Sequence, residues 1–391
     1  MTQGVLSPCN TDRYFSSVIG LSWLRNLQGT ESKRCTCIDI LAVKRDLLMI
    51  DRITVAPGYD IARIIKGGWH LAGGHGPVSP DQAVVDMAAF VEAGITTFDC
   101  ADIYTGVEEL IGRFRAARPD LAARLQVHTK FVPDLGDLAH VDRAYVTRVI
   151  DRSLARLGVD RLDIVQFHWW DYAVPGYVAA AMVLDDLRRA GKIRLVGATN
   201  FDAPRLGEII DAGVPVATHQ VQYSVLDRRP AGTMSDLAST HGVRFLCYGT
   251  VAGGFLSERW VGVPAPELAT LSNRSLVKYR LIIDEFGGWD RFQALLATLA
   301  RVGARHGCDI ATVATRVVLD WPHVAAAIVG ATNAAHVASH QRVAGLHLDD
   351  EDRAAIDAAM GDGGATGEVY ALERDRHGPH GRIMKYDLSK A

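Results

Sequence analysis

The sequence predicts an α/β protein in which eight parallel strands close into a single-domain (β/α)8 TIM barrel. From about residue 60, short apolar runs alternate with longer amphipathic segments, which is the pattern of βαβ units. Eight such runs can be distinguished, and eight units favour a closed barrel over an open sheet. An open doubly wound sheet would place a glycine-rich turn at the start of its first helix. The first run is instead followed by Lys66-Gly67-Gly68-Trp69, which does not match that pattern.

Strands and helices are expected to follow one another in regular order. The expected strands are 62–65, 96–98, 125–129, 162–167, 193–198, 214–218, 243–247 and 325–329. The expected helices are 81–93, 108–117, 143–157, 178–190, 204–212, 234–241, 291–306, 311–319 and 334–343. Ser79 followed by Pro80 is a good helix opening, and glycines such as Gly158 and Gly242 are typical helix ends.

Three regions differ in character along the chain. Residues 1–55 lack strand or helix periodicity, and we expect a mobile or non-native extension, with a targeting segment or a structural addition as alternatives. Residues 56–361 are expected to form the barrel, with a long irregular loop at 253–290 after the seventh strand and an extra helix at 349–360. Residues 362–391 form a polar, glycine-rich tail that is either a flap or disordered.

Composition argues against several classes of function. The net charge of −3 gives no electrostatic reason to bind nucleic acid or an anionic membrane. No apolar run reaches the roughly 18 residues that span a bilayer. The six cysteines are scattered, and Cys35 and Cys37 are too close for the usual zinc pair, so no metal is expected. This cysteine usage fits a reducing compartment, and we expect a cytoplasmic protein.

Polar side chains follow the expected strands at their carboxyl ends. Asp99, Lys130 and His168 come directly after the second, third and fourth strands, and Tyr104 lies five residues beyond Asp99. The carboxyl ends of barrel strands converge on one mouth, where barrel enzymes hold their active sites. We therefore expect these four side chains to be neighbours.

These four side chains together form a set that can donate a proton. A lysine ammonium beside a tyrosine lowers the tyrosine pKa from its usual value of about 10. An aspartate paired with the lysine keeps the lysine charged and oriented, and a histidine opposite can hydrogen-bond a carbonyl oxygen. Such a set donates a proton to an oxygen that gains negative charge. The set contains no obvious nucleophile to attack the carbonyl carbon, and a hydride from a reduced nicotinamide fits that gap.

Several ordered motifs resemble those of the aldo-keto reductases. The longer ones cover residues 94–112, 153–168 and 191–201, and shorter ones follow at 220–223, 248–254 and 328–331. The resemblance covers about residues 60–360 and implies a barrel that reduces an aldehyde or ketone with NAD(P)H. It gives Tyr104 the role of general acid, with Asp99 and Lys130 tuning its pKa and His168 orienting the carbonyl.

The resemblance also implies a set of cofactor-binding residues. Residues after the fifth and sixth strands would hold the nicotinamide carboxamide, and Tyr248 would stack on the ring. The segment after Tyr248 would follow the pyrophosphate, and the segment after the last strand would meet the adenosine. The implied residues are Thr199, Asn200, Gln220, Tyr248, Gly249, Val251, Gly253, Gly330, Ala331, Thr332, Asn333 and His340.

The resemblance favours NADP(H), with NAD(H) as the alternative. Many relatives carry a basic residue near the position of Thr332 and a Glu-Asn pair near the positions of Ser339 and His340. This chain lacks both features, which weakens the inference that a positive charge binds the 2′-phosphate. Trp69 and Trp169 lie on mouth loops and are expected to wall a small-molecule carbonyl or alcohol substrate, with ordinary loop packing as the alternative.

Two other functions are consistent with the same residues. A Schiff-base aldolase would use Lys130 as its nucleophile, but such a lysine needs to be neutral and the Asp99 partner argues against it. A non-catalytic subunit that binds nicotinamide would need no proton donor, and the complete set of four residues favours retained chemistry. The oligomeric state does not follow from the sequence.

Overall fold

The computed structural model describes residues 50–73, 76, 78–330 and 333–388. The fold described below is that of the compact unit Leu48–Ala391, within those ranges. What the sequence predicts for residues 1–49 lies outside the described residues.

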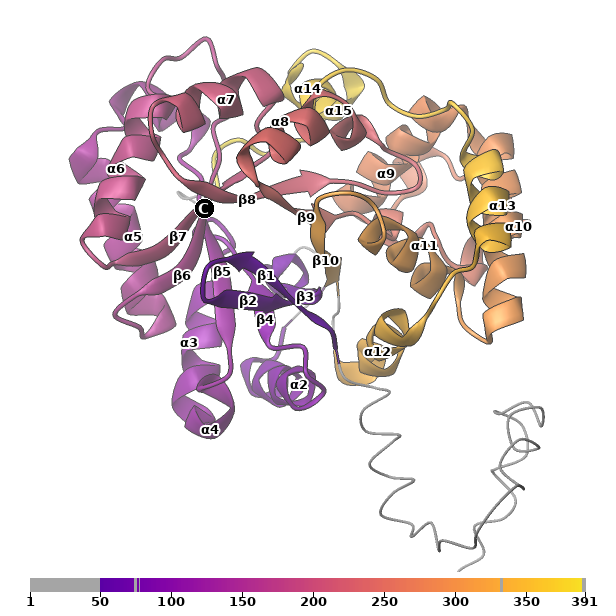
Figure 1. Ribbon diagram of the computed structural model, residues 1–391, viewed down its shortest axis with the longest axis horizontal. Helices are drawn as coiled ribbons and strands as arrows, with labels where there is room; N and C mark the ends of the chain where they lie inside the picture. Colours follow the sequence, from indigo (N-terminus) through magenta and orange to yellow (C-terminus); the bar gives the residue numbers. More distant parts are fainter. Residues whose placement is uncertain (1–49, 74–75, 77, 331–332, 389–391) are drawn as a thin grey trace, which may run out of the picture. The chain divides into compact units, whose positions relative to one another are not determined.

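Eight parallel strands form a closed barrel, which confirms the predicted fold class (Figure 1). The strands pair in the order β10-β3-β4-β5-β6-β7-β8-β9, so neighbours in space follow one another along the chain. Their bounds are β3 Ile64–Gly67, β4 Thr97–Asp99, β5 Gln126–Phe131, β6 Leu162–Phe167, β7 Ile193–Thr199, β8 Val216–Gln222, β9 Arg244–Tyr248 and β10 Val324–Gly330.

Helices cover the outside of the barrel (Figure 1). The helices between strands are α2 Pro80–Glu92, α3 Val107–Ala117, α4 Pro119–Ala122, α5 Arg143–Leu157, α6 Tyr177–Arg189, α7 Ala203–Asp211, α8 Thr233–His241, α9 Arg274–Phe286, α10 Trp289–His306 and α11 Ile310–Leu319, with α12 Val337–Gly345 after β10. Helix α5 buries Val146 and, three, four, seven and eleven residues further on, Val149, Ile150, Ser153 and Leu157, so these side chains share one face of the helix. As predicted, Ser79 caps α2 by accepting a hydrogen bond from the Gln82 amide.

A hairpin that the sequence analysis missed precedes the barrel. Strands β1 (Arg52–Ala56) and β2 (Tyr59–Ala62) pair antiparallel, so the predicted boundary at residue 55 falls inside a strand. Tyr59 and Ile61 pack with residues of the barrel interior, including Ile164. The overlooked signal was the Pro-Gly pair at 57–58, where the glycine adopts a positive φ of 68° between two alternating runs.

The segment after β9 is long, as predicted, but it is not irregular throughout. Residues Arg274–Phe286 form α9, whose first turn is capped by Asn273 through a hydrogen bond from the Leu276 amide. Helix α13 (Asp350–Met360) coincides closely with the extra helix predicted at 349–360, and Asp349 and Asp352 cap it reciprocally.

The C-terminal tail folds back onto the barrel and contributes two short helices, α14 (Ala371–Arg374) and α15 (Pro379–Arg382), drawn in yellow in Figure 1. Tyr370, Glu373 and His380 are buried. The tail is therefore a packed part of the molecule, and it reaches the mouth described next.

Candidate active site

The loops at the carboxyl ends of the barrel strands enclose a cavity of about 710 Å3. Asp99, Tyr104, Lys130 and His168 all line this cavity, so the structure brings the four predicted neighbours together. The tail supplies part of the wall. The sequence analysis did not include that wall in the site.

A buried ion pair forms the floor of the cavity. The Lys130 Nζ lies 2.9 and 2.7 Å from the two carboxylate oxygens of Asp99 and 2.8 Å from the carbonyl oxygen of Cys100. The same Nζ lies 5.0 Å from the centre of the Tyr104 ring. Lys130 and Asp99 are only 5% and 4% exposed, so water screens their interaction weakly.

Two opposing effects set the pKa of Tyr104: the predicted lowering by the Lys130 ammonium and a larger raising effect of burial, which the sequence analysis did not foresee. Burial raises the pKa of Tyr104 above its usual value, and the lowering effect of the Lys130 ammonium does not overcome it. Burial alone would lower the pKa of Lys130, but the Asp99 carboxylate and, to a smaller extent, Tyr104 together outweigh burial and raise it. The site therefore holds a protonated phenol beside a charged ammonium.

Two glutamine amides complete the floor, and one of them was missed. The Gln166 side-chain nitrogen donates to Asp99 Oδ1 over 3.0 Å. The Gln220 side-chain nitrogen donates to the same oxygen over 2.6 Å and to Gln166 Oε1 over 3.0 Å. Gln220 thus uses its amide hydrogens within the floor, while the residue also lines the cavity, where the sequence analysis predicts that it helps to hold the nicotinamide carboxamide. Strand periodicity could have found Gln166, because residues 166 and 168 share one face.

His168 hydrogen-bonds the neighbouring strand through one ring nitrogen only. Its Nδ1 lies 3.0 Å from the Thr199 carbonyl oxygen, and its Nε2 is buried without a hydrogen-bond partner among the described residues. Trp170 and Tyr370 stand edge-on to the ring, at 4.4 and 5.6 Å between centres. Burial, with a smaller contribution from the Arg374 charge, lowers the pKa of His168 to about 3, so the ring is neutral near pH 7.

Most residues predicted to bind cofactor line the same cavity. Asn200 adopts a positive φ of 60°, which is rare for a residue with a side chain, and its Oδ1 accepts a hydrogen bond from Tyr248 over 2.9 Å. Asn333 does not line the cavity, and its side chain caps the turn that follows it. Ala331 and Thr332 lie outside the described residues. The predicted residues that do line the cavity are Thr199, Asn200, Gln220, Tyr248, Gly249, Val251, Gly253, Gly330 and His340.

The glycines near the cavity make room for protein side chains. Gly249 and Gly253 have positive φ angles of 78° and 63°, and a Cβ on either would collide with the Tyr279 ring. A Cβ on Gly330 would collide with the His70 ring. These glycines therefore let Tyr279 and His70 approach the main chain at the cavity.

The donor set around the cavity fits a dinucleotide. Among its described lining residues, the cations outnumber the anions, which suits the negative pyrophosphate of a nicotinamide cofactor. Tyr248 supplies an aromatic face, and amide, hydroxyl and imidazole groups supply hydrogen bonds. The charged lining residues are Lys130, Arg259, Arg274, Lys278 and Lys385, against Asp99.

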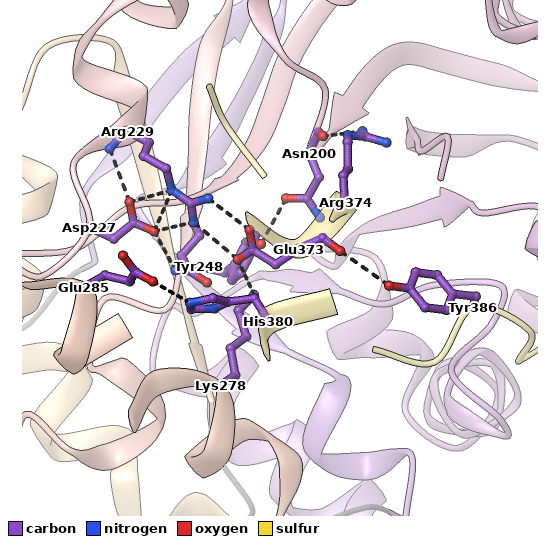
Figure 2. A network of polar contacts seen from close by, with 11 residues as sticks. Asn200, Asp227, Arg229, Tyr248, Lys278, Glu285, Glu373, Arg374, His380 and Tyr386 are labelled. Carbon is purple, nitrogen blue, oxygen red and sulfur yellow. Dashed lines mark hydrogen bonds and ion pairs between the residues drawn. The ribbon is translucent and has the colours of Figure 1, made fainter. Parts of the chain in front are cut away.

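A network of buried charges fastens the tail beside the cavity (Figure 2). Glu373 pairs with Arg229 at 3.0 Å and with Lys278 at 3.4 Å, and Arg229 also pairs with Asp227 at 2.7 Å. Burial alone would raise the pKa of Glu373, but the Lys278 and Arg229 charges lower it to about 2. The tail carboxylate is therefore held by two cations from other parts of the chain.

The next residue of the tail fastens two loops of the mouth. The Arg374 guanidinium donates to the carbonyl oxygens of Trp169, Trp170 and Asn200 over 2.5, 2.7 and 2.7 Å (Figure 2 shows the bond to Asn200). It also lies over the Tyr172 ring at 3.8 Å. Arg374 thereby links the loop after β6 to the loop after β7.

The two tryptophans predicted to wall the substrate behave differently. Trp69 lines the cavity and packs edge-on against Tyr104 at 5.1 Å between ring centres. Trp169 is fully buried, and its ring nitrogen donates to carbonyl oxygens two and five residues further along the chain. The prediction for Trp169 is wrong, because the chain turns after β6 and it is Trp170 that faces the cavity.

The described residues show no sign of a metal or membrane site. Nowhere among them do three His, Cys, Asp or Glu side chains gather as a metal would require. None of the helices in the described ranges combines the length and the apolar character of a membrane span.

A closed barrel whose mouth joins a buried lysine–aspartate pair, a tyrosine and an aromatic cavity is the architecture of a barrel oxidoreductase. The chain belongs to the aldo/keto reductase family, whose model matches residues 63–360. It is accordingly an oxidoreductase that acts on carbonyl or alcohol groups with a nicotinamide cofactor.

Similar proteins support this assignment. Aldo-keto reductase YhdN of Bacillus subtilis is 27% identical over 315 residues, which cover 78% of this chain and 91% of the relative. Flagellar radial spoke protein 5 of Chlamydomonas reinhardtii is 31% identical over an alignment of 300 residues. This alignment covers 61% of this chain and only 56% of that longer protein. The solved structure of glycerol dehydrogenase AKR11B4 from Gluconobacter oxydans matches with a TM-score of 0.69 and 25% identity, covering 79% of this chain and 95% of that one.

Proposed function

We propose that the protein reduces an aldehyde or ketone to the alcohol, or catalyses the reverse oxidation, with Tyr104 as the general acid. The observation that carries this proposal is the position of the Lys130 ammonium. It contacts the Asp99 carboxylate at 2.7 Å and lies 5.0 Å from the centre of the Tyr104 ring, inside the cavity at the barrel mouth.

The chemistry follows from the charges of these groups. The raised pKa of Tyr104 keeps the phenol protonated, so it is ready to give its proton to a carbonyl oxygen. The Lys130 ammonium stabilises the phenolate that remains, and the Asp99 carboxylate fixes the ammonium in place. When bound in the cavity, a reduced nicotinamide would supply the hydride that the carbonyl carbon needs.

The cofactor would be held by residues that line the cavity. We propose that Thr199, Asn200 and Tyr248 hold the nicotinamide end and that the segment around His340 meets the adenosine. NADP(H) remains the preferred candidate by family resemblance. NAD(H) is the second candidate because burial lowers the pKa of His340 to about 4, and a neutral ring offers no charge to a 2′-phosphate.

The two alternative functions are less well supported. An aldolase would need a neutral Lys130, whereas Asp99 raises the pKa of this lysine. A subunit without catalytic activity would have no use for a buried ion pair beside a tyrosine. Trapping of a carbonyl compound on Lys130 by borohydride would favour the aldolase. Cofactor binding without turnover of any carbonyl would favour the subunit without catalytic activity.

The substrate and the cellular setting are proposed from the surroundings of the site. Glycerol dehydrogenase AKR11B4, a structural neighbour, is named for a small alcohol, which supports a small carbonyl or alcohol here. The three described cysteines, Cys100, Cys247 and Cys308, are free thiols, which supports a reducing compartment such as the cytoplasm.

The proposal is tested by titrating the protein with NADPH and NADH and then following cofactor oxidation with a panel of carbonyls. Tyr104→Phe removes the acidic hydrogen but keeps the ring. We expect this variant to lose turnover and to keep cofactor affinity within a few-fold. Tyr145→Phe is the matched control, because Tyr145 lies on α5, is not among the cavity-lining residues and donates its hydroxyl hydrogen to Asp137. Near-normal turnover in Tyr104→Phe would remove this residue from the acid role.

A further inference from the structure

Tyr104 lies on a short loop between β4 and α3, and two buried acidic residues stand on either side of it in the chain. Asp102 precedes Tyr104 by two residues, and Glu108 follows it by four. Their exposed fractions are only 5% and 1%, although neither residue lines the cavity. A buried carboxylate is costly unless it is paired or hydrogen-bonded, so the partners of these two groups indicate their role.

Both carboxylates accept hydrogen bonds from the end of β5, the strand that carries Lys130. The Val132 amide donates to the Asp102 carboxylate over 3.2 Å. The Thr129 hydroxyl donates to a carboxylate oxygen of Glu108 over 2.6 Å. Thr129 is the residue directly before Lys130, and Val132 is the second residue after it. The loop that carries the phenol is therefore tied, before and after the phenol, to the segment that carries the ammonium.

One arginine on α5 contacts the same two acidic residues from outside the barrel. The Arg156 Nη1 donates to the main-chain carbonyl oxygen of Asp102 over 3.2 Å and lies 3.4 Å from a carboxylate oxygen of Glu108. The Arg156 Nε forms an ion pair with Glu109 at 2.8 Å. Helix α3 approaches α5 closely here because Gly112 has no side chain, since a Cβ on it would lie 2.1 Å from the Arg156 carbonyl oxygen.

The position of these contacts matters because the phenol and the ammonium act on each other through space. The Lys130 Nζ lies 5.0 Å from the centre of the Tyr104 ring. The effect of a charge falls with distance, and a displacement of about 1 Å is enough to slow an enzyme strongly. Arg156 is not among the residues that line the cavity, and its side chain is 30% exposed. Because so exposed an ion pair adds little stability by itself, the contribution of Arg156 lies in holding the loop.

We infer that Asp102, Glu108 and Arg156 are positioning residues, which hold the Tyr104 phenol at its place relative to the Lys130 ammonium from outside the cavity. The kinetic consequence of this inference rests on the proposed function. The geometric consequence does not, because the ionisation of the phenol can be measured without substrate.

Arg156→Met is the main test, because it removes the guanidinium and keeps much of the side-chain length. Fluorotyrosine in place of tyrosine lowers phenol pKa values, and the fluorine signal of Tyr104, assigned by its absence from Tyr104→Phe, reports ionisation. We expect the titration midpoint to rise by at least about half a pH unit in Arg156→Met, because a more distant ammonium lowers the pKa of the phenol less. An unchanged midpoint would overturn the inference.

The groups that act on the charge of the phenol are not altered in these variants. A change in the midpoint therefore reports a change in position. These groups are Lys130, Asp99, the Cys100 thiol and the phenols of Tyr279 and Tyr370.

Two further variants separate position from charge. Arg156→Lys keeps the positive charge, but one ammonium cannot replace the planar group at all three acceptors, so we expect a smaller rise of the midpoint. A rise in Arg156→Met that is fully absent from Arg156→Lys would show that charge alone acts, and would overturn the inference. Arg143→Met is the matched control, because Arg143 lies on the same helix and pairs with Asp186 on α6. An equal rise in this control would also overturn the inference.

The kinetic consequence is measured with the cofactor and a reactive aldehyde. We expect kcat of Arg156→Met to fall by about 10-fold, with the dissociation constant of the cofactor within a few-fold of wild type, because a displaced proton donor affects turnover more than binding. Equal losses of kcat and cofactor affinity would show general damage and overturn the inference. If the wild type turned over no carbonyl while the midpoint still rose in Arg156→Met, the proposed function would fail and the positioning role would stand.

Discussion

Two buried polar networks meet at the mouth of the barrel, and they are built in opposite ways. The floor joins Asp99, Lys130, Gln166 and Gln220 from strand ends whose positions the barrel itself fixes. The tail network joins Glu373 to Arg229, a residue 144 positions earlier in the chain. The first network depends on strand register, whereas the second exists only when the tail docks.

The two networks also differ in whether they leave a charge that can act on groups in the cavity. In the floor, the Lys130 ammonium is paired with Asp99 and still faces the Tyr104 ring, so its charge acts on a group in the cavity. In the tail, the charges of Glu373 and Arg229 are balanced within the network. The comparison therefore assigns the proton chemistry to the floor and the shape of the pocket to the tail.

Removing the charge of the floor should have the largest effect on turnover. Lys130→Met leaves the phenolate of Tyr104 without a counter-charge, and we expect kcat/KM to fall by about 10²- to 10⁴-fold. Steady-state kinetics with a reactive aldehyde measure this. Lys192→Met is the control, because Lys192 forms a half-exposed ion pair with Asp151 and should lose little. Retention of more than a tenth of the activity in Lys130→Met would contradict this division of roles.

Breaking the tail network should act mainly on stability. Glu373→Gln leaves Arg229 and Lys278 without their shared buried carboxylate, and we expect the free energy of unfolding to fall by about 3–5 kcal/mol. Urea unfolding followed by fluorescence measures the change. Glu92→Gln, which breaks an exposed contact with Arg118, should cost less than about 1 kcal/mol. Equal losses in the two variants would show that the tail network does not hold the fold.

Acid should weaken the two regions in different pH windows. Burial lowers the pKa of His128, His168 and His219 to about 3, below the usual 6.5. Between pH 6.5 and 3 the unfolded chain therefore binds more protons than the folded chain. The free energy of unfolding decreases as the pH is lowered through this range, by on the order of 1 kcal/mol per histidine and pH unit. The pKa of Glu373 is about 2 instead of 4.5, so its contribution is full above 4.5 and is lost only as the pH falls toward 2. Urea midpoints that stay constant between pH 6.5 and 5 would contradict the histidine part.

The smallest expected effect is on the affinity for the cofactor. Arg374→Met releases the carbonyl oxygen of Asn200, a residue whose positive φ needs support from its surroundings. We expect the dissociation constant for the nicotinamide cofactor to rise by about 10-fold, equivalent to about 1.4 kcal/mol. Fluorescence titration measures it, with Arg376→Met, which breaks an exposed pair with Asp171, as the control. An unchanged dissociation constant would mean that Arg374 serves the fold alone.

The sequence could predict the barrel and most of the floor because both follow from periodicity. Apolar runs gave the strands, and their carboxyl ends identified Asp99, Lys130 and His168 without any knowledge of the fold in space. The floor amides were harder, because the sequence does not show that Gln220 bonds Asp99 in preference to a ligand.

The tail could not be predicted in the same way. Its residues follow no strand or helix period, and partners such as Arg229 and Asn200 lie 144 and 174 positions away in the chain. The error at Trp169 has a related cause, since a turn after β6 decides which of two consecutive tryptophans faces the cavity. The rise in the pKa of Tyr104 depends on burial, which needs the three-dimensional structure.

The most direct test of this division of roles measures cofactor affinity and turnover on the same preparations of Lys130→Met and Arg374→Met. The account predicts opposite patterns. Lys130→Met should bind the cofactor within a few-fold of wild type and fail in turnover, whereas Arg374→Met should bind it weakly and turn over well once the cofactor saturates. Equal losses of affinity and turnover in both variants would contradict the separation of floor and tail.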